Sequence, residues 1–203
     1  MPTATAVYGD GSVTLTATVT SANGAALTGG TVTFVVKQGA TVRATVTSGP
    51  VVGASPATAS ATLPLDATWG AGNYTVVASY AGNACFTPSE GTGTLTVARR
   101  ILVIRPLDRS VGFRQPNPPN DPHTDPACSA PNWCLQLAAG SSFAPGESFA
   151  NLNLTNLRFV YSRNYPFSNA SETVGQRYAI SAYGVFGTNY GIRYQAGTLT
   201  VGP

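Results

Sequence analysis

The stretch SVTLTATVT, residues 12–20, decides the fold class of this chain. Its apolar residues alternate one by one with threonines: Val13, Leu15, Ala17 and Val19 against Thr14, Thr16, Thr18 and Thr20. Successive side chains of a β-strand point to opposite faces, so this period of two predicts a strand with one buried face. Threonine is β-branched and suits the exposed face of such a strand.

The same alternation recurs in TVTFVVK, residues 31–37, and in NYTVVASY, residues 73–80. The residues predicted to point inward are Val32, Phe34, Val36, Tyr74, Val76, Ala78 and Tyr80. Glycine-rich and proline-rich turn signals separate the strands at spacings of about ten residues, as in β-sandwiches. We therefore predict an all-β fold.

The pentapeptide GTLTV occurs twice, at 93–97 and at 197–201, and each copy predicts a final strand. Each copy also follows an Asn-Tyr pair, at 73–74 and at 189–190. Two domains that end alike explain this repeat, so we predict domains at 1–97 and 98–203. The segment ARRILVIRP, which begins at Ala98, is predicted to be both the linker and the first strand of the second domain.

The composition excludes several other classes. Charged residues make up only 9% of the 203 residues, whereas 43% are hydrophobic and the chain holds 26 Thr, 16 Ser and 22 Gly. This balance argues against a helical protein and against a disordered one. The net charge of +3 is too weak to argue for nucleic-acid binding. No apolar run reaches the roughly 20 residues of a membrane-spanning helix, so we expect no membrane insertion.

Residues 7–97 resemble a bacterial Ig-like repeat, on the motifs VYGDGSVTLTATVTS, LTGGTVTF, AGNYTVVASYAGNACFTPS and GTLTV. Residues 101–201 resemble an MBG-type repeat, on the motifs ILVIRPLDRSVGFRQPNPP, YAISAYG and NYGIRYQAGTLTV. Repeats of these kinds occur in large bacterial surface and adhesin-like proteins. The resemblance therefore implies two tandem β-sandwich domains, of the Ig-like and the MBG type.

The resemblance implies a non-catalytic, extracellular stalk or spacer at the cell surface, with no cofactor. No signal-peptide pattern opens the chain, so export information is expected to have been removed or to lie elsewhere in a longer parent. The first alternative is a filament subunit joined by strand exchange, and the second is a carbohydrate-binding module. The expected partners are neighbouring repeats or identical subunits at β-edges, or a glycan or host surface.

The first domain starts late compared with the repeats it resembles, which usually have a strand before the Tyr-Gly found here at Tyr8-Gly9. We expect residues 3–7 to be too few to fill that place, which would leave a sheet edge unpaired. An unpaired edge is a template for another chain. The candidate donors are GTLTVGP, at the C-terminal end, and ILVIRP, which starts at Ile101.

The second domain carries a proline-rich insertion at about 115–135, which includes Cys128 and Cys134. We predict a disulfide between them, because it would pin a stretch that has little core of its own. Cys85 is the odd cysteine, so it is either unpaired or bonded to another chain.

The segment NDPHTDP, residues 120–126, holds two carboxylates and the single histidine. Asp121 and Asp125 are calcium candidates, although no EF-hand spacing is present. The alternative is that the stretch is an ordered coil, because prolines interrupt it. Too few ligands lie near for zinc. His123 lacks a motif-borne serine partner, so no catalytic residue is predicted.

Several aromatic residues have two possible roles. Trp133, Tyr161, Tyr165 and Phe167 could stack on sugar rings or could anchor core and loops. Tyr74 and Tyr190 are predicted to anchor their domains from matching penultimate strands. Five arginines near the junction could contact an acidic glycan or a neighbouring subunit, but a solvated hinge is the more usual role: Arg99, Arg100, Arg105, Arg109 and Arg114.

Overall fold

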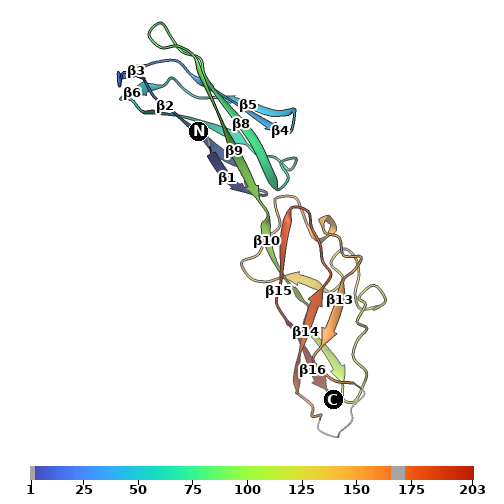
Figure 1. The fold of residues 1–203 in the computed structure, drawn as a ribbon. Coiled ribbons are helices and arrows are strands. Elements are labelled where there is room, and N and C mark those ends of the chain that lie inside the picture. Colours follow the sequence, from blue (N-terminus) through green and yellow to red (C-terminus); the bar gives the residue numbers. More distant parts are fainter. Residues whose placement is uncertain (1–2, 166–171) are drawn as a thin grey trace. The chain divides into compact units, whose positions relative to one another are not determined.

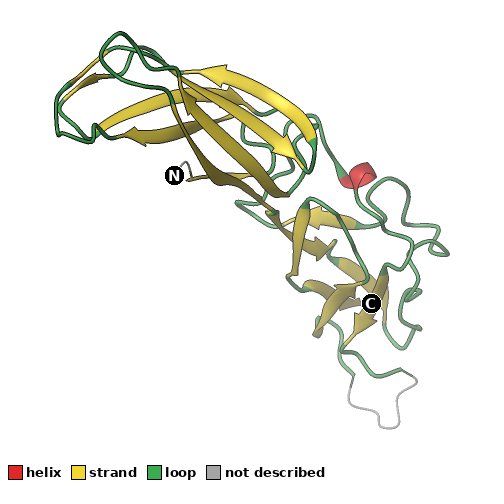
Figure 2. Cartoon of the chain, turned by 45° about the horizontal axis from the view of Figure 1, so that its top comes forward, coloured by secondary structure: helices red, strands yellow, loops and turns green. Residues whose placement is uncertain are grey.

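The computed structural model describes residues 3–165 and 172–203, and it confirms the all-β prediction. Of these described residues, 49% lie in strands and 2% in helix. The chain divides into two compact units, Met1–Arg99 (unit 1) and Arg100–Pro203 (unit 2). Each unit is described by itself below (Figures 1 and 2). Phe167, one of the predicted stacking residues, lies outside the described residues.

Unit 1 is a two-layer β-sandwich (Figure 1). Its larger sheet has the order β1-β9-β8-β4-β5, from β1 (Thr3–Val7), β9 (Ser89–Ala98), β8 (Gly72–Tyr80), β4 (Val32–Gln38) and β5 (Thr41–Thr47). The other strands form two pairs: β2 (Ser12–Val19) with β7 (Ala57–Pro64), and β3 (Leu27–Thr28) with β6 (Val52–Gly53).

The alternation in the sequence correctly predicted which strand faces are buried in unit 1. Leu15 of β2, Phe34 of β4 and Leu95 of β9 are at most 1% exposed, and the threonines between the inward residues of β2 are exposed. All four predicted inward residues of β8 are buried. The alternation determines which face of each strand points to the core, because burial of the apolar side chains on that face removes apolar surface from water.

The expectation that residues 3–7 are too few to fill the place of an opening strand is wrong. They form β1, which pairs in parallel with the end of β9, from Thr3↔Thr94 to Val7↔Ala98. A turn then ends the strand, since the Val7 N–H donates to the Asp10 carboxylate at 2.8 Å. Five residues suffice because β9 offers a preformed partner edge and Ala6 adds its side chain to the core.

Unit 2 has two further sheets. One has the order β12-β10-β15, from β12 (Leu135–Leu137), β10 (Arg100–Pro106) and β15 (Tyr190–Tyr194). The other has the order β11-β16-β14-β13, from β11 (Arg109–Gly112), β16 (Gly197–Gly202), β14 (Arg177–Tyr183) and β13 (Arg158–Tyr161). Both expected strand donors are thus used inside unit 2, ILVIRP in β10 and GTLTVGP in β16, so neither is free to join another chain.

The core of unit 2 is drawn from both of its sheets. Its hydrophobic residues of at most 1% exposure are Leu102, Ile104, Leu135, Leu157, Phe159, Ile180, Leu199 and Val201. No strand lies between Gly112 and Leu135, which is where the insertion at 115–135 was expected. This long connection, together with a short 3-10 helix at Phe149–Asn151, builds the candidate site.

Candidate functional site

A cleft of about 620 Å³ opens beside the proline-rich connection of unit 2. We call it the loop cleft, and its lining residues are Asp121, His123, Ala130, Pro131, Trp133, Phe149, Ala150, Leu152, Leu154 and Thr155. Its volume falls within the range of about 300–1,000 Å³ that is usual for small-ligand sites. Aromatic rings, one carboxylate and the Thr155 side chain meet among apolar residues, which is the composition of a site for a ligand with both apolar and polar faces.

A disulfide closes the loop that carries Trp133. Cys128 and Cys134 are bonded, with their Cα atoms 5.1 Å apart. Trp133 and Cys134 have φ values of 49° and 63°, in the left-handed region that costs a non-glycine residue about 1–2 kcal/mol. The Trp133 N–H donates to the Ser129 carbonyl at 2.9 Å and helps to hold this conformation. Backbone strain of this kind gathers at binding and catalytic sites, so it supports a role for the indole.

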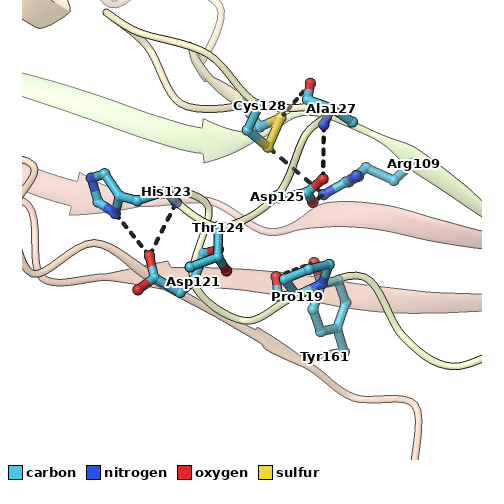
Figure 3. Close-up of polar contacts among 10 residues, drawn as sticks. Arg109, Pro119, Asp121, His123, Thr124, Asp125, Ala127, Cys128 and Tyr161 are labelled. Carbon is cyan, nitrogen blue, oxygen red and sulfur yellow. Dashed lines mark hydrogen bonds and ion pairs between the residues drawn. A yellow bond between two sulfur atoms is a disulfide. The ribbon is translucent and has the colours of Figure 1, made fainter.

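The Trp133 ring contacts the imidazole of His123, which Asp121 orients. The two ring centroids lie 4.5 Å apart and the rings are tilted by 49°. His123 Nδ1 lies 2.8 Å from Asp121 Oδ1, and the His123 N–H donates to the same oxygen at 3.0 Å (Figure 3). These hydrogen bonds from His123 hold the pKa of Asp121 below its usual value. Asp121 is therefore charged at neutral pH and offers hydrogen-bond acceptors at the cleft.

A second ion pair anchors the same connection to the sheet. Arg109 of β11 donates to the Asp125 carboxylate, which also accepts the Ala127 N–H at 2.9 Å (Figure 3). Burial acts to raise the pKa of Asp125, but the hydrogen bonds from Arg109 and Ala127 outweigh it and lower that pKa. The interpretation of Arg109 as part of a solvated hinge is wrong. Sequence reasoning missed this pair because its members are 16 residues apart and no local pattern joins them.

Both calcium candidates already bind protein groups through their carboxylates. Asp125 is taken up by Arg109 and Ala127, while Asp121 binds His123 and lies 3.3 Å from the Arg158 guanidinium. Within residues 3–165 and 172–203, no group of three or more His, Cys, Asp or Glu could hold a metal ion.

Neither Tyr161 nor Tyr165 joins Trp133 at the loop cleft. Tyr161 is 9% exposed, and burial raises the pKa of its hydroxyl, so of its two possible roles it takes the core role and not sugar stacking. Its ring completes the core because it lies on the inward face of β13. Tyr165 is exposed, with the Arg163 guanidinium 5.9 Å from its ring centroid, but it does not line the loop cleft.

The two predicted anchor tyrosines lie in penultimate strands, and both are buried. The Tyr74 hydroxyl donates to the Gly70 carbonyl at 2.8 Å, and its ring lies 5.0 Å from that of Trp69. The Tyr190 hydroxyl accepts the Ala144 N–H at 3.0 Å and donates to Glu147. Each hydroxyl thus binds a loop while its ring sits in the core. Cys85 is a free, exposed thiol.

The strand order and layering of unit 1 define an immunoglobulin-like β-sandwich. Residues 1–98 match the family model of the bacterial Ig-like domain (group 3). This match confirms that the first half of the chain resembles a bacterial Ig-like repeat. The match ends before unit 2, so the resemblance of unit 2 to an MBG-type repeat stays a prediction. No curated protein matches the chain.

Bacterial Ig-like domains are generally non-catalytic, and the family match and the disulfide both fit an extracellular protein. Among the described residues, no helix has the length and apolarity to cross a membrane.

Proposed function

We propose that the chain is a non-catalytic, extracellular segment of a bacterial-type surface protein and that it serves as a tension-bearing stalk or spacer. The family match of unit 1 supports a structural or adhesive repeat. The observation that carries the mechanical role is the parallel pairing of an early strand with a late strand in each unit.

In unit 1, tension on the two chain ends acts on β1 and β9. These strands run parallel and are paired over five residues, so the two pulls act in opposite directions along one ladder. The ladder is then loaded in shear, and its hydrogen bonds must break together rather than one at a time. Shear loading slows forced unfolding, which depends on the unfolding rate rather than on the equilibrium stability.

Unit 2 repeats this arrangement with two ladders. The chain enters through β10, which pairs in parallel with β15 from Arg100↔Tyr190 to Ile104↔Tyr194. It leaves through β16, which pairs in parallel with β11 from Arg109↔Leu199 to Gly112↔Gly202. Tension between the start of β10 and the end of β16 therefore loads a parallel ladder in each of the two sheets of unit 2.

Single-molecule force spectroscopy on the full chain tests this proposal. Pulling from the two termini of a Cys85→Ser background should unfold unit 1 at about twice the force, or more, that is needed when handles sit at Thr31→Cys and Gly49→Cys. Those two positions flank the open end of the antiparallel β4–β5 hairpin, which peels one residue pair at a time. Equal forces in the two geometries would contradict a tension-bearing role.

A carbohydrate-binding role is a second candidate, and the loop cleft is the observation that favours it. Aromatic faces pack against the apolar faces of sugar rings, and Trp133 and His123 present such faces. The Asp121 carboxylate, held charged by its partners, can accept hydrogen bonds from sugar hydroxyls. The ligand class is therefore a neutral or cationic sugar rather than an acidic one.

An array of neutral, amino and acidic glycans, probed with the fluorescently labelled chain, tests this candidate. Binding to neutral or amino sugars should be lost in Trp133→Ala and kept in Tyr165→Ala, because Tyr165 is an exposed aromatic residue outside the cleft. Absence of binding to every glycan, or equal binding by Trp133→Ala, would rule the cleft out as a sugar site.

A further inference from the structure

The two sulfur atoms of the Cys128–Cys134 disulfide lie in different surroundings, although both cysteines are 7% exposed. Sγ of Cys128 lies 3.8 Å from Nη1 of Arg109, the side chain that also binds Asp125 (Figure 3). Sγ of Cys134 lies 3.5 Å from the carbonyl oxygen of Ala127. One sulfur therefore faces a cation, and the other faces the negative end of a peptide dipole.

This difference favours one of the two sulfurs as a leaving group. A disulfide breaks when an incoming thiolate attacks one sulfur and the other sulfur leaves with the electron pair, and a better stabilised thiolate leaves faster. A neighbouring arginine stabilises the thiolate of a cysteine, so Arg109 favours the departure of Cys128. The Ala127 carbonyl oxygen would repel a thiolate on Cys134, so both contacts favour the same direction.

The Asp125 carboxylate shares Arg109 with this sulfur without occupying the whole guanidinium. One carboxylate oxygen accepts from Arg109, while the other accepts the Ala127 N–H at 2.9 Å. A guanidinium has five N–H donors in a planar fork, so it can bind a carboxylate and a thiolate together. The Arg109 side chain is only 15% exposed, so water screens its charge little at this place.

We propose that this disulfide is a site of thiol exchange with a fixed direction. The thiolate of a small thiol attacks Sγ of Cys134, the bond between the two cysteines breaks, and a new disulfide joins the thiol to Cys134. Cys128 keeps the electron pair as a thiolate beside Arg109. The electrons balance, because the incoming thiol is oxidised to a mixed disulfide while Cys128 is reduced. The low exposure of both cysteines favours a small thiol over a protein as the reactant.

Opening the disulfide also releases the loop that carries Trp133. Trp133 and Cys134 have left-handed backbone conformations, which are unfavourable for non-glycine residues and which the closed loop maintains. Trp133 and Pro131 line the loop cleft, so exchange changes its wall and should weaken sugar binding there. This last consequence rests on the proposed sugar site, whereas the exchange and its direction do not. Absence of glycan binding by the untreated chain would remove the sugar site and leave the exchange untouched.

Mapping the mixed disulfide tests the direction of exchange. The Cys85→Ser chain is treated briefly with 2-mercaptoethanol, free thiols are capped with excess N-ethylmaleimide, and peptide mass spectrometry locates both labels. In the folded chain we expect mercaptoethanol on Cys134 and maleimide on Cys128, at least about fivefold more often than the reverse. In urea the sulfurs lose their contacts with Arg109 and Ala127, so the two patterns should be about equally frequent.

Two variants test whether Arg109 sets this direction. Arg109→Met combined with Asp125→Asn leaves no carboxylate unpaired and should reduce the excess to below about twofold. Arg193→Met removes an exposed arginine of β15 and should keep the full excess. Melting curves show whether each variant is folded. If the double variant does not fold, the comparison of the folded chain with the chain in urea still decides.

Four results would overturn the proposal. They are an excess of mercaptoethanol on Cys128, equal labelling of the two cysteines in the folded chain, an excess on Cys134 that persists in urea, and a folded chain that reacts only when it unfolds. A folded double variant that keeps the full excess would overturn the role of Arg109.

Discussion

The guanidinium of Arg163 forms a two-point ion pair with Glu172, and both side chains are excluded from solvent. Arg163 Nε donates to Glu172 Oε1 at 2.6 Å and Nη2 donates to Oε2 at 3.0 Å. The pair reaches back to the proline-rich connection, because Arg163 also donates to the Gln115 carbonyl at 2.8 Å and Glu172 accepts the Arg114 N–H at 2.9 Å. This ion pair thus fixes the segment after β13 against the segment after β11.

Removing one partner of this pair should destabilise unit 2 strongly. Arg163→Met leaves the Glu172 carboxylate buried without its cation, so we expect the melting temperature of unit 2 to fall by more than about 10 °C. The double variant Arg163→Met with Glu172→Leu removes both charges and should melt above Arg163→Met. Differential scanning calorimetry measures both. A double variant whose loss equals the sum of the two single losses would show that the charges are not coupled.

Acid should destabilise unit 2 more than unit 1. The carboxyl groups with lowered pKa are Asp108, Asp121, Asp125 and Glu172 in unit 2, against Asp66 in unit 1. A carboxyl with a depressed pKa adds stability that is complete above its unfolded value, about 3.9 for Asp and 4.3 for Glu. That stability is lost as the pH falls through the lower folded value. The melting temperature of unit 2 should therefore drop below about pH 4.

The two tryptophans make this difference measurable, because Trp69 lies in unit 1 and Trp133 in unit 2. Fluorescence melting of Trp133→Phe reports unit 1, and melting of Trp69→Phe reports unit 2. We expect the melting temperature of unit 2 to fall by more than that of unit 1 as the pH is lowered from 6 toward 3. Transitions that shift in parallel would contradict the assignment of these stabilising carboxylates to unit 2.

Loss of the disulfide should cost unit 2 about 2 kcal/mol, the chain-entropy value for so short a loop. The double variant Cys128→Ser with Cys134→Ser tests this in urea, and Cys85→Ser is the control that should leave stability unchanged because its thiol is free and exposed. Intact-mass measurement gives an independent check. Alkylation of the unfolded chain should add one label before reduction and three labels after it.

Truncation of Tyr74 should separate the contribution of its ring from that of its hydroxyl. Tyr74→Ala removes a ring that is 2% exposed and should cost about 3–5 kcal/mol of unfolding free energy. Tyr74→Phe loses only the hydrogen bond to the Gly70 carbonyl, about 1 kcal/mol. Tyr183→Ala, at an exposed position, should change stability by less than about 0.5 kcal/mol. Chemical denaturation measures all three, and a loss below about 1 kcal/mol for Tyr74→Ala would contradict the anchoring role.

Much of the fold could be predicted from the sequence, because the relevant signal is local. The strands at 12–20, 31–37 and 73–80 were found from their period of two, and the buried residues Leu15, Phe34 and Val76 lie on the predicted faces. The candidate site was predicted less completely. Trp133 was one of several candidate aromatic residues, and no pattern indicated that His123, rather than Tyr161, lies beside it.

What the sequence by itself determined is therefore the class of structure: all-β, with one face of each patterned strand buried. The alternation of apolar and polar side chains is a property of neighbouring residues. Burial of apolar surface turns the apolar face of each strand toward the core, whatever the order of the strands in the sheets. The tertiary structure alone decided the partners. It paired β1 with the end of β9 and joined Arg109 to Asp125. Such relationships depend on where distant segments of the chain meet, and this is set by the packing of whole sheets rather than by any local run of residues.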